Sequence, residues 1–179
     1  MSEAPGPTAL AGRLDRRGTG AAYAGLLCLV VLCAAGLVGL LLRTPWLFPS
    51  LGPTVMIFFE SRATPAARPR SALIGHGVGL VVGYGCLAAF GLTRSPSIVQ
   101  SGVTVPHLLA GALSVAVTAA VLVLLRAPHP PAGATTLIVS LGILREPLQL
   151  LSMAGAVVLI TVLGVVLNRL LLGPAPASA

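Results

Sequence analysis

Four long stretches of this chain are apolar and almost free of charge, and they restrict the fold more than any other feature. They are residues 20–42, 71–92, 107–125 and 148–171. A helix rises about 1.5 Å per residue, so each stretch can cross a hydrocarbon core of about 30 Å. Only 8% of the residues are charged, whereas a soluble domain has roughly a quarter. The sequence therefore predicts an integral membrane protein.

The composition also indicates which kind of membrane protein to expect. Aromatic residues make up 4% of the chain, and the sequence shows neither the alternating polarity nor the aromatic girdles of a membrane β-barrel. We expect an all-α membrane protein, a six-segment bundle of four full transmembrane helices and two broken, half-helix segments.

The boundaries of these parts can be placed along the chain. We expect a polar N-terminal tail over 1–19, a first repeat over 20–92, a connecting loop over 93–106, a second repeat over 107–171 and a C-terminal tail over 172–179.

The net charge of +7 comes from eleven basic residues, all of them arginine. They lie mostly between the apolar stretches, where the positive-inside rule expects them. The lipid bilayer is therefore the expected partner of this charge, and nucleic-acid binding is not expected.

Two stretches rich in proline and glycine, 43–60 and 126–144, interrupt the apolar pattern. Proline cannot continue a helix through its interior, so we expect each to be an extended piece followed by a short helix. The motif Leu-Leu-Arg-x-Pro starts at Leu41 and again at Leu124, and Pro-x-x-Gly-x-Thr starts at Pro49 and again at Pro130. This order indicates an internal repeat, although the restricted composition of membrane proteins also produces chance matches.

The arginines distinguish two topologies for the broken segments. If both segments cross, the chain crosses six times with its N-terminus inside, and the arginines outside the cytoplasm are Arg43, Arg94 and Arg145. The other eight arginines then face the cytoplasm, as the positive-inside rule requires. If both segments re-enter, five arginines lie inside and six outside. The six-crossing chain predicts two inverted halves in the inner (plasma) membrane, with a site at the midplane.

Each short helix begins within the membrane, where backbone amides without partners are costly. The N-terminus of a helix also carries a partial positive charge that suits an anion. Neither broken segment has an acidic residue near this position, so we expect a small-anion site. The expected binding residues are His129, Pro130, Pro131, Gly133, Ala134, Thr135, Thr136, Ser50, Gly52, Thr54 and His76.

The histidines leave two interpretations open. His129 can bind the anion or couple a proton to it, and it can equally cap backbone carbonyls at the helix break. His76 lies within an apolar stretch, where an ionisable group is a functional candidate or a hydrogen-bonded structural residue. Gly75, Gly79 and Gly83 share one helix face and allow close helix approach, including in a homo-oligomer.

Other kinds of function have little support in the sequence. We find no paired carboxylates, no spacing of metal ligands and no nucleophile with an orienting base, so neither an enzyme nor a metal or cofactor site is expected. The alternatives to an anion transporter are a carrier of another small organic or neutral solute and a non-transporting scaffold subunit.

The segment from His129 to Thr135, together with Ser50 to Thr54, Ala67 to Arg70 and Ile74 to His76, resembles the signature of the HPP family of integral membrane proteins. The resemblance covers roughly residues 49–171. It implies four membrane spans, whereas the arginine distribution favours six. Some chloroplast and cyanobacterial members are similar to nitrite transporters, so the resemblance implies transport of nitrite or another small anion.

Overall fold

The computed structural model describes residues 7–172, with side chains described over 18–171. These residues form helices joined by short links and contain no strand. The helices are α1 (Pro7–Leu42), α2 (Leu51–Glu60), the short 3₁₀ helix η1 (Pro65–Ala67), α3 (Pro69–Ala89), α4 (Ile98–Ser101), α5 (Val105–Leu124), α6 (Pro131–Ser140) and α7 (Pro147–Leu172). The chain is therefore all-helical in its described part.

Four of these helices are long and apolar enough to cross a membrane: α1, α3, α5 and α7. Their apolar parts coincide with the four stretches predicted from the sequence, so the prediction of a multi-pass helical membrane protein is confirmed. Leucine and valine side chains remain exposed along them, for example Leu40, Val81 and Leu124. Such residues suit contact with lipid tails, because the exposed apolar surface needs no protein partner there.

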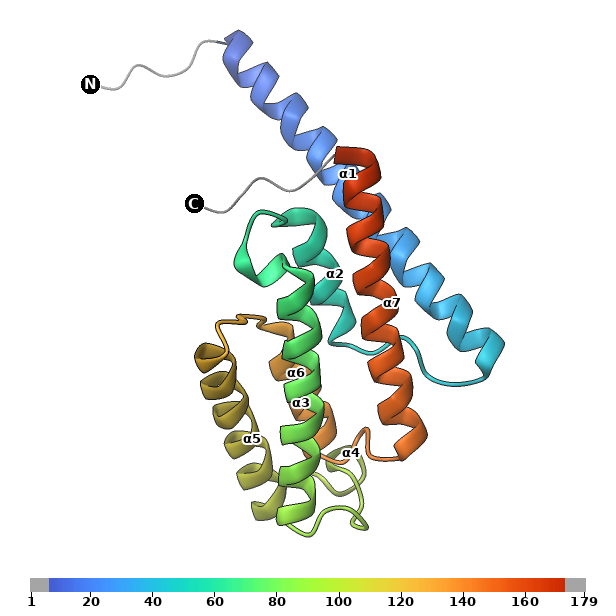
Figure 1. Ribbon diagram of the computed structural model, residues 1–179, viewed down its shortest axis with the longest axis vertical. Coiled ribbons are helices and arrows are strands. Elements are labelled where there is room, and N and C mark those ends of the chain that lie inside the picture. The colour runs from blue at the N-terminus through green and yellow to red at the C-terminus, as the bar shows by residue number, and fades with distance from the viewer. Residues whose placement is uncertain (1–6, 173–179) are drawn as a thin grey trace, which may run out of the picture.

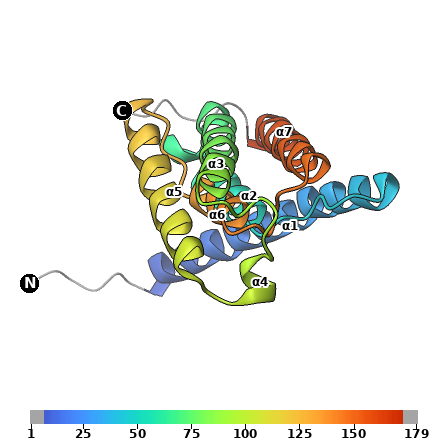
Figure 2. The ribbon, with the colours of Figure 1, turned by 90° about the horizontal axis from the view of Figure 1, so that it is seen from below.

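Helix α3 lies at the centre of the bundle. It contacts α5, α6 and α7, and Figure 2 shows it between α5 on one side and α7 on the other. Helix α1 runs obliquely across the bundle and contacts α2 and α7.

The two ten-residue helices α2 and α6 begin near the same level and run in opposite directions (Figure 1). Hydrogen bonds from side chains and the backbone connect further elements at the two ends of the bundle. Asn168 near the end of α7 donates to the carbonyl of Phe58 in α2 and accepts from Tyr23 of α1. At the opposite end, the amide of Ile98 in α4 donates to the carbonyl of Leu141 after α6.

Several helix boundaries differ from the sequence expectation. Helix α1 starts at Pro7, so residues 7–19 continue the helix and do not form the expected tail. The expected tail at 172–179 lies outside the described residues apart from residue 172. Helix α2 starts at Leu51 and α6 at Pro131, three residues before Thr54 and Ala134, where the apolar pattern predicts the two short helices to begin. Proline is tolerated in the first turn because its missing amide would have no helical partner there.

The glycine face of α3 packs against α6 of the same chain. A Cβ atom at Gly75, Gly79 or Gly83 would lie within 3 Å of an atom of His129, Ala132 or Thr136, respectively. The predicted close approach of another helix is therefore confirmed. The face is occupied by α6 within the chain, and a homo-oligomer through these glycines stays a prediction.

Candidate functional site

Five polar side chains meet where α2 and α6 begin. Ser50 precedes α2, Thr54 lies in α2, His76 in α3, His129 precedes α6 and Thr135 lies in α6. All five are at most 1% exposed. Because burying a polar group without a partner is costly, their hydrogen bonds decide whether this arrangement is stable.

The two histidines connect both short helices. His76 lies between two threonines, with Nε2 2.8 Å from Oγ1 of Thr54 and Nδ1 2.7 Å from Oγ1 of Thr135. His129 Nε2 lies 3.2 Å from Oγ1 of Thr54 and 3.3 Å from Nε2 of His76. Oγ1 of Thr135 lies 2.9 Å from Oγ of Ser50. We call Ser50, Thr54, His76, His129 and Thr135 the histidine–hydroxyl cluster.

Two backbone carbonyls determine where protons lie in this cluster. Nδ1 of His129 is 3.0 Å from the carbonyl oxygen of Ala66, which can only accept, so Nδ1 carries the hydrogen. Oγ1 of Thr54 donates to the carbonyl of Ser50 over 3.0 Å. The lone pairs of the Thr54 hydroxyl are therefore free to accept from imidazole nitrogens.

The sequence prediction included all five residues of the cluster, and the structure brings them together. The other predicted residues lie beside it. Thr136 donates to the carbonyl of Ala132 and pairs with Thr118 of α5 at 3.0 Å. The remaining predicted residues shape the backbone at the two helix starts; they are Gly52, Pro130, Pro131, Gly133 and Ala134.

The expected free amides at the start of α6 are only partly present. The amides of Ala132 and Gly133 donate to the carbonyls of His129 and Pro130, each over 3.0 Å. The amide of Leu51 likewise donates to the carbonyl of Phe48 over 2.9 Å. The expectation that the first amides of the short helices lack partners is therefore wrong at Gly133, because a tight turn at the helix start satisfies this donor.

A second set of buried hydroxyls lies between α5 and α6. Ser114 Oγ donates to Ser140 Oγ over 3.0 Å, and Thr118 pairs with Thr136. Sequence reasoning missed Ser114 and Thr118, although the spacing of four residues between them places both on the buried face of α5. No sequence signal points to the carbonyl of Ala66, because any residue type would supply it.

A cavity of about 480 Å³ lies between α5 and the link before α6. His129 borders it together with Thr118, Arg126 and Gly133. A Cβ atom at Gly133 would meet no atom within 4 Å, so the start of α6 faces open space there. This cavity therefore adjoins the histidine–hydroxyl cluster at His129.

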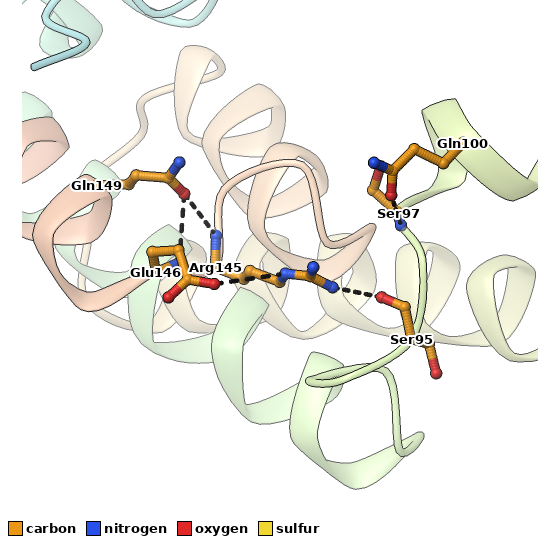
Figure 3. Close-up of polar contacts among 6 residues, drawn as sticks. All are labelled: Ser95, Ser97, Gln100, Arg145, Glu146 and Gln149. Atoms are coloured by element: carbon orange, nitrogen blue, oxygen red, sulfur yellow. Dashed lines mark hydrogen bonds and ion pairs between the residues drawn. The ribbon is translucent and has the colours of Figure 1, made fainter.

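At the other end of the bundle, Arg145 connects the start of α7 to the loop after α3 (Figure 3). Its Nη1 donates to the carbonyl of Ser95, and its Nε lies 3.7 Å from a carboxylate oxygen of Glu146. The side-chain oxygen of Gln149 accepts from the amides of both Arg145 and Glu146. These bonds hold the α3–α4 loop against the first turn of α7.

The comparisons with known proteins give one match. The family model described as the HPP transmembrane region matches residues 15–175. No curated protein and no solved structure matches the chain. Because the family match spans nearly the whole chain, including every residue of the histidine–hydroxyl cluster, the chain belongs to the family of HPP transmembrane proteins.

Proposed function

We propose that this chain is a transporter or channel for a small inorganic anion, with nitrite as the first candidate, and that the histidine–hydroxyl cluster and its adjoining cavity form the binding site. One observation carries the proposal. Buried polar side chains from two oppositely directed short helices meet beside a cavity that His129 borders. Buried polar groups within membrane proteins commonly mark a solute pathway.

The charges near the cluster favour an anion over a cation. Both glutamates with described side chains, Glu60 and Glu146, lie at helix ends and are exposed. The cluster itself offers hydroxyls, imidazoles and the positive ends of two helix dipoles, and Arg126 borders the cavity. A cation site would require carboxylate or carbonyl ligands pointing into the site. The available donors instead match the oxygen atoms of an anion such as nitrite.

The arrangement of helices supports an inverted repeat of three segments in each half. We exchange α1 with α5, α2 with α6 and α3 with α7. The α1–α2 contact then becomes α5–α6, the α2–α7 contact becomes α6–α3, and the α1–α7 contact becomes α5–α3. Each resulting contact is present in the structure. Such a relationship between halves places the substrate site of many transporters where the half-helices meet.

The backbone after α1 and α5 also repeats. Arg43 and Arg126 both have left-handed φ angles, 53° and 49°. The amide of Thr44 donates to the carbonyl of Gly39, five residues back, as the amide of Ala127 does to Leu122. Both helices thus end in the same cap, which glycine rather than arginine usually forms. We infer that residues 43–60 and 126–144 are equivalent broken crossings.

Purified protein in liposomes provides the test. We expect nitrite uptake above that of protein-free vesicles, and we expect it to be lost when Thr135→Val and His129→Ala are combined. Thr161→Val is the control, because Thr161 is buried in α7 and its hydroxyl has no partner. Uptake that survives the double substitution would contradict the site, and cation flux without anion flux would contradict the substrate class.

A further inference from the structure

We propose that His129 carries one transported proton with each anion, so that this chain is an electroneutral proton–anion symporter. The inference rests on the anion transport proposed above and adds the coupled ion and its residue. It follows from the hydrogen-bond directions in the histidine–hydroxyl cluster and from the cavity beside His129.

The neutral cluster leaves a place for one proton between the two imidazoles. His129 holds its hydrogen on Nδ1 for the carbonyl of Ala66, so its Nε2 is an acceptor. Thr135 donates its hydroxyl hydrogen to Oγ of Ser50, so Nδ1 of His76 donates to Oγ1 of Thr135 and Nε2 of neutral His76 is an acceptor. The two Nε2 lone pairs therefore face each other over 3.3 Å, and the Thr54 hydroxyl beside them gives its hydrogen to the carbonyl of Ser50.

The same geometry accepts one further proton without rearrangement. A proton added to Nε2 of His129 points toward Oγ1 of Thr54 at 3.2 Å. That oxygen can accept it because its own hydrogen goes to the carbonyl of Ser50. Nε2 of His76, 3.3 Å from Nε2 of His129, is a second acceptor for the same proton. His129 becomes a cation, and every N–H of the two rings keeps an acceptor.

A second proton on the pair is disfavoured. The ring centroids of His76 and His129 are 5.0 Å apart, and two positive charges at this distance repel strongly in a buried site. The cluster contains no carboxylate to offset them. The pair is therefore limited to one proton, and a monovalent anion beside it makes the loaded site neutral.

His129 is the residue of the pair that can meet a solute. It borders the 480 Å³ cavity together with Arg126 and Gly133, whereas His76 is held between Thr54 and Thr135. Charging the ring of His129 places a positive charge at the cavity wall, where an anion can pair with it. When the anion leaves, the proton leaves the same Nε2 atom, and the neutral cluster forms again.

The other titratable and charged groups belong to the packed elements and their links, some of them at the opposite end of the bundle. Arg70 in the first turn of α3 donates to the carbonyl of Leu125 over 3.4 Å, and the exposed Glu60 ends α2. The others are Arg62 and Arg68 in the link before α3, Arg126 at the cavity, Arg145, Glu146 and Arg169 at the ends of α7, and His107 at the start of α5. The arginines stay charged at all relevant pH values.

The test measures nitrite and protons together in proteoliposomes that contain a trapped pH indicator, with protein-free vesicles subtracted. We expect inward nitrite flux to acidify the lumen and to be unaffected by a potassium diffusion potential imposed with valinomycin. We also expect the rate to fall roughly tenfold per pH unit once the outer pH exceeds the midpoint, as for a step that needs one bound proton.

Three variants assign the proton to its residue. His129→Gln keeps a hydrogen-bonding side chain but cannot hold the charge, so any remaining uptake should lose its pH dependence. His76→Gln should be slower and retain the pH dependence. His107→Gln, at a buried histidine outside the cluster, should behave as the unmodified protein. The folding of each variant is checked by its size-exclusion profile and melting temperature.

The outcomes separate the two proposals. Protein-dependent nitrite uptake that follows the imposed potential without acidifying the lumen would overturn proton symport and leave anion transport standing. A pH dependence that is unchanged in His129→Gln and lost in His107→Gln would also overturn it. Absence of any protein-dependent nitrite uptake would overturn both proposals. If His129→Gln does not fold, loss of the pH dependence in His76→Gln overturns the assignment to His129.

Discussion

Gly75 on α3 lies directly against the side chain of His129. A Cβ atom at position 75 would come within 2.8 Å of the Cβ of His129 and 3.2 Å of its Cδ2. The absence of a side chain at Gly75 thus allows His129 to reach His76 and Thr54.

Gly75→Ala should therefore destabilise the protein and disturb the site. We expect a loss of about 1–3 kcal/mol, the usual cost of inserting a methyl group into a packed interior. Gly77→Ala is the matched control on the same helix, since a Cβ there meets no atom within 4 Å. It should be neutral or more stable, because alanine favours a helix by up to about 1 kcal/mol over glycine. Thermal unfolding in detergent measures both, and equal effects would contradict the predicted contact.

Thr135→Val should remove a hydroxyl on which two buried atoms depend. Nδ1 of His76 and Oγ of Ser50 would each lose a partner, at a cost of about 1–3 kcal/mol for each unsatisfied group. Thr161→Val is the same substitution at a buried threonine whose hydroxyl has no partner. It should therefore leave the stability unchanged or raise it. Melting temperatures that shift in opposite directions would agree with this prediction. A melting temperature for Thr135→Val at or above that of the unmodified protein would contradict it.

Arg145→Ala should loosen the loop between α3 and α4, because the bond from Arg145 to the carbonyl of Ser95 is lost (Figure 3). We expect a loss of about 1 kcal/mol for this partly exposed charged donor. Glu146→Gln removes only an ion pair whose carboxylate side chain is 65% exposed, and it should change stability by less than about 0.5 kcal/mol. Hydrogen exchange should rise over residues 92–98 in the first variant only, and a rise in both would assign the effect to the ion pair.

The proposed six crossings predict which loops face the cytoplasm. In a variant without native cysteines, Ser61→Cys and Thr93→Cys place single thiols at exposed positions in the links before α3 and α4. A membrane-impermeant maleimide applied to intact cells should label Thr93→Cys, and it should label Ser61→Cys only after the membrane is opened. The re-entrant topology with four crossings predicts the reverse pattern, so labelling of Ser61→Cys from outside would exclude the six-crossing arrangement.

Much of the candidate site could be predicted, because polar and ionisable residues within apolar membrane segments are easily recognised in the sequence. His76 is ionisable within an apolar stretch, and Ser50, Thr54, His129 and Thr135 lie in stretches whose prolines break a helix. In each case the inference needed only local residue chemistry and the cost of polar groups in lipid. The repeated motifs then related Thr54 to Thr135 across 81 positions (135 minus 54).

Other features could not be read from the sequence. The tight turns that satisfy the amides of Leu51, Ala132 and Gly133 depend on backbone angles that several residue types can adopt. The pairing of Ser114 with Ser140 and of Thr118 with Thr136 depends on how α5 and α6 are rotated about their axes. Periodicity shows that a face is buried, but it does not identify the helix that covers it.

The sequence by itself determined the four long apolar helices and identified the residues of the polar cluster, because hydropathy, proline and glycine act locally. Only the tertiary structure decided that α6 covers Gly75, Gly79 and Gly83, and that both imidazoles share Thr54. These contacts join residues far apart in the chain, and they follow from close packing among all the helices at once. No local pattern contains that information.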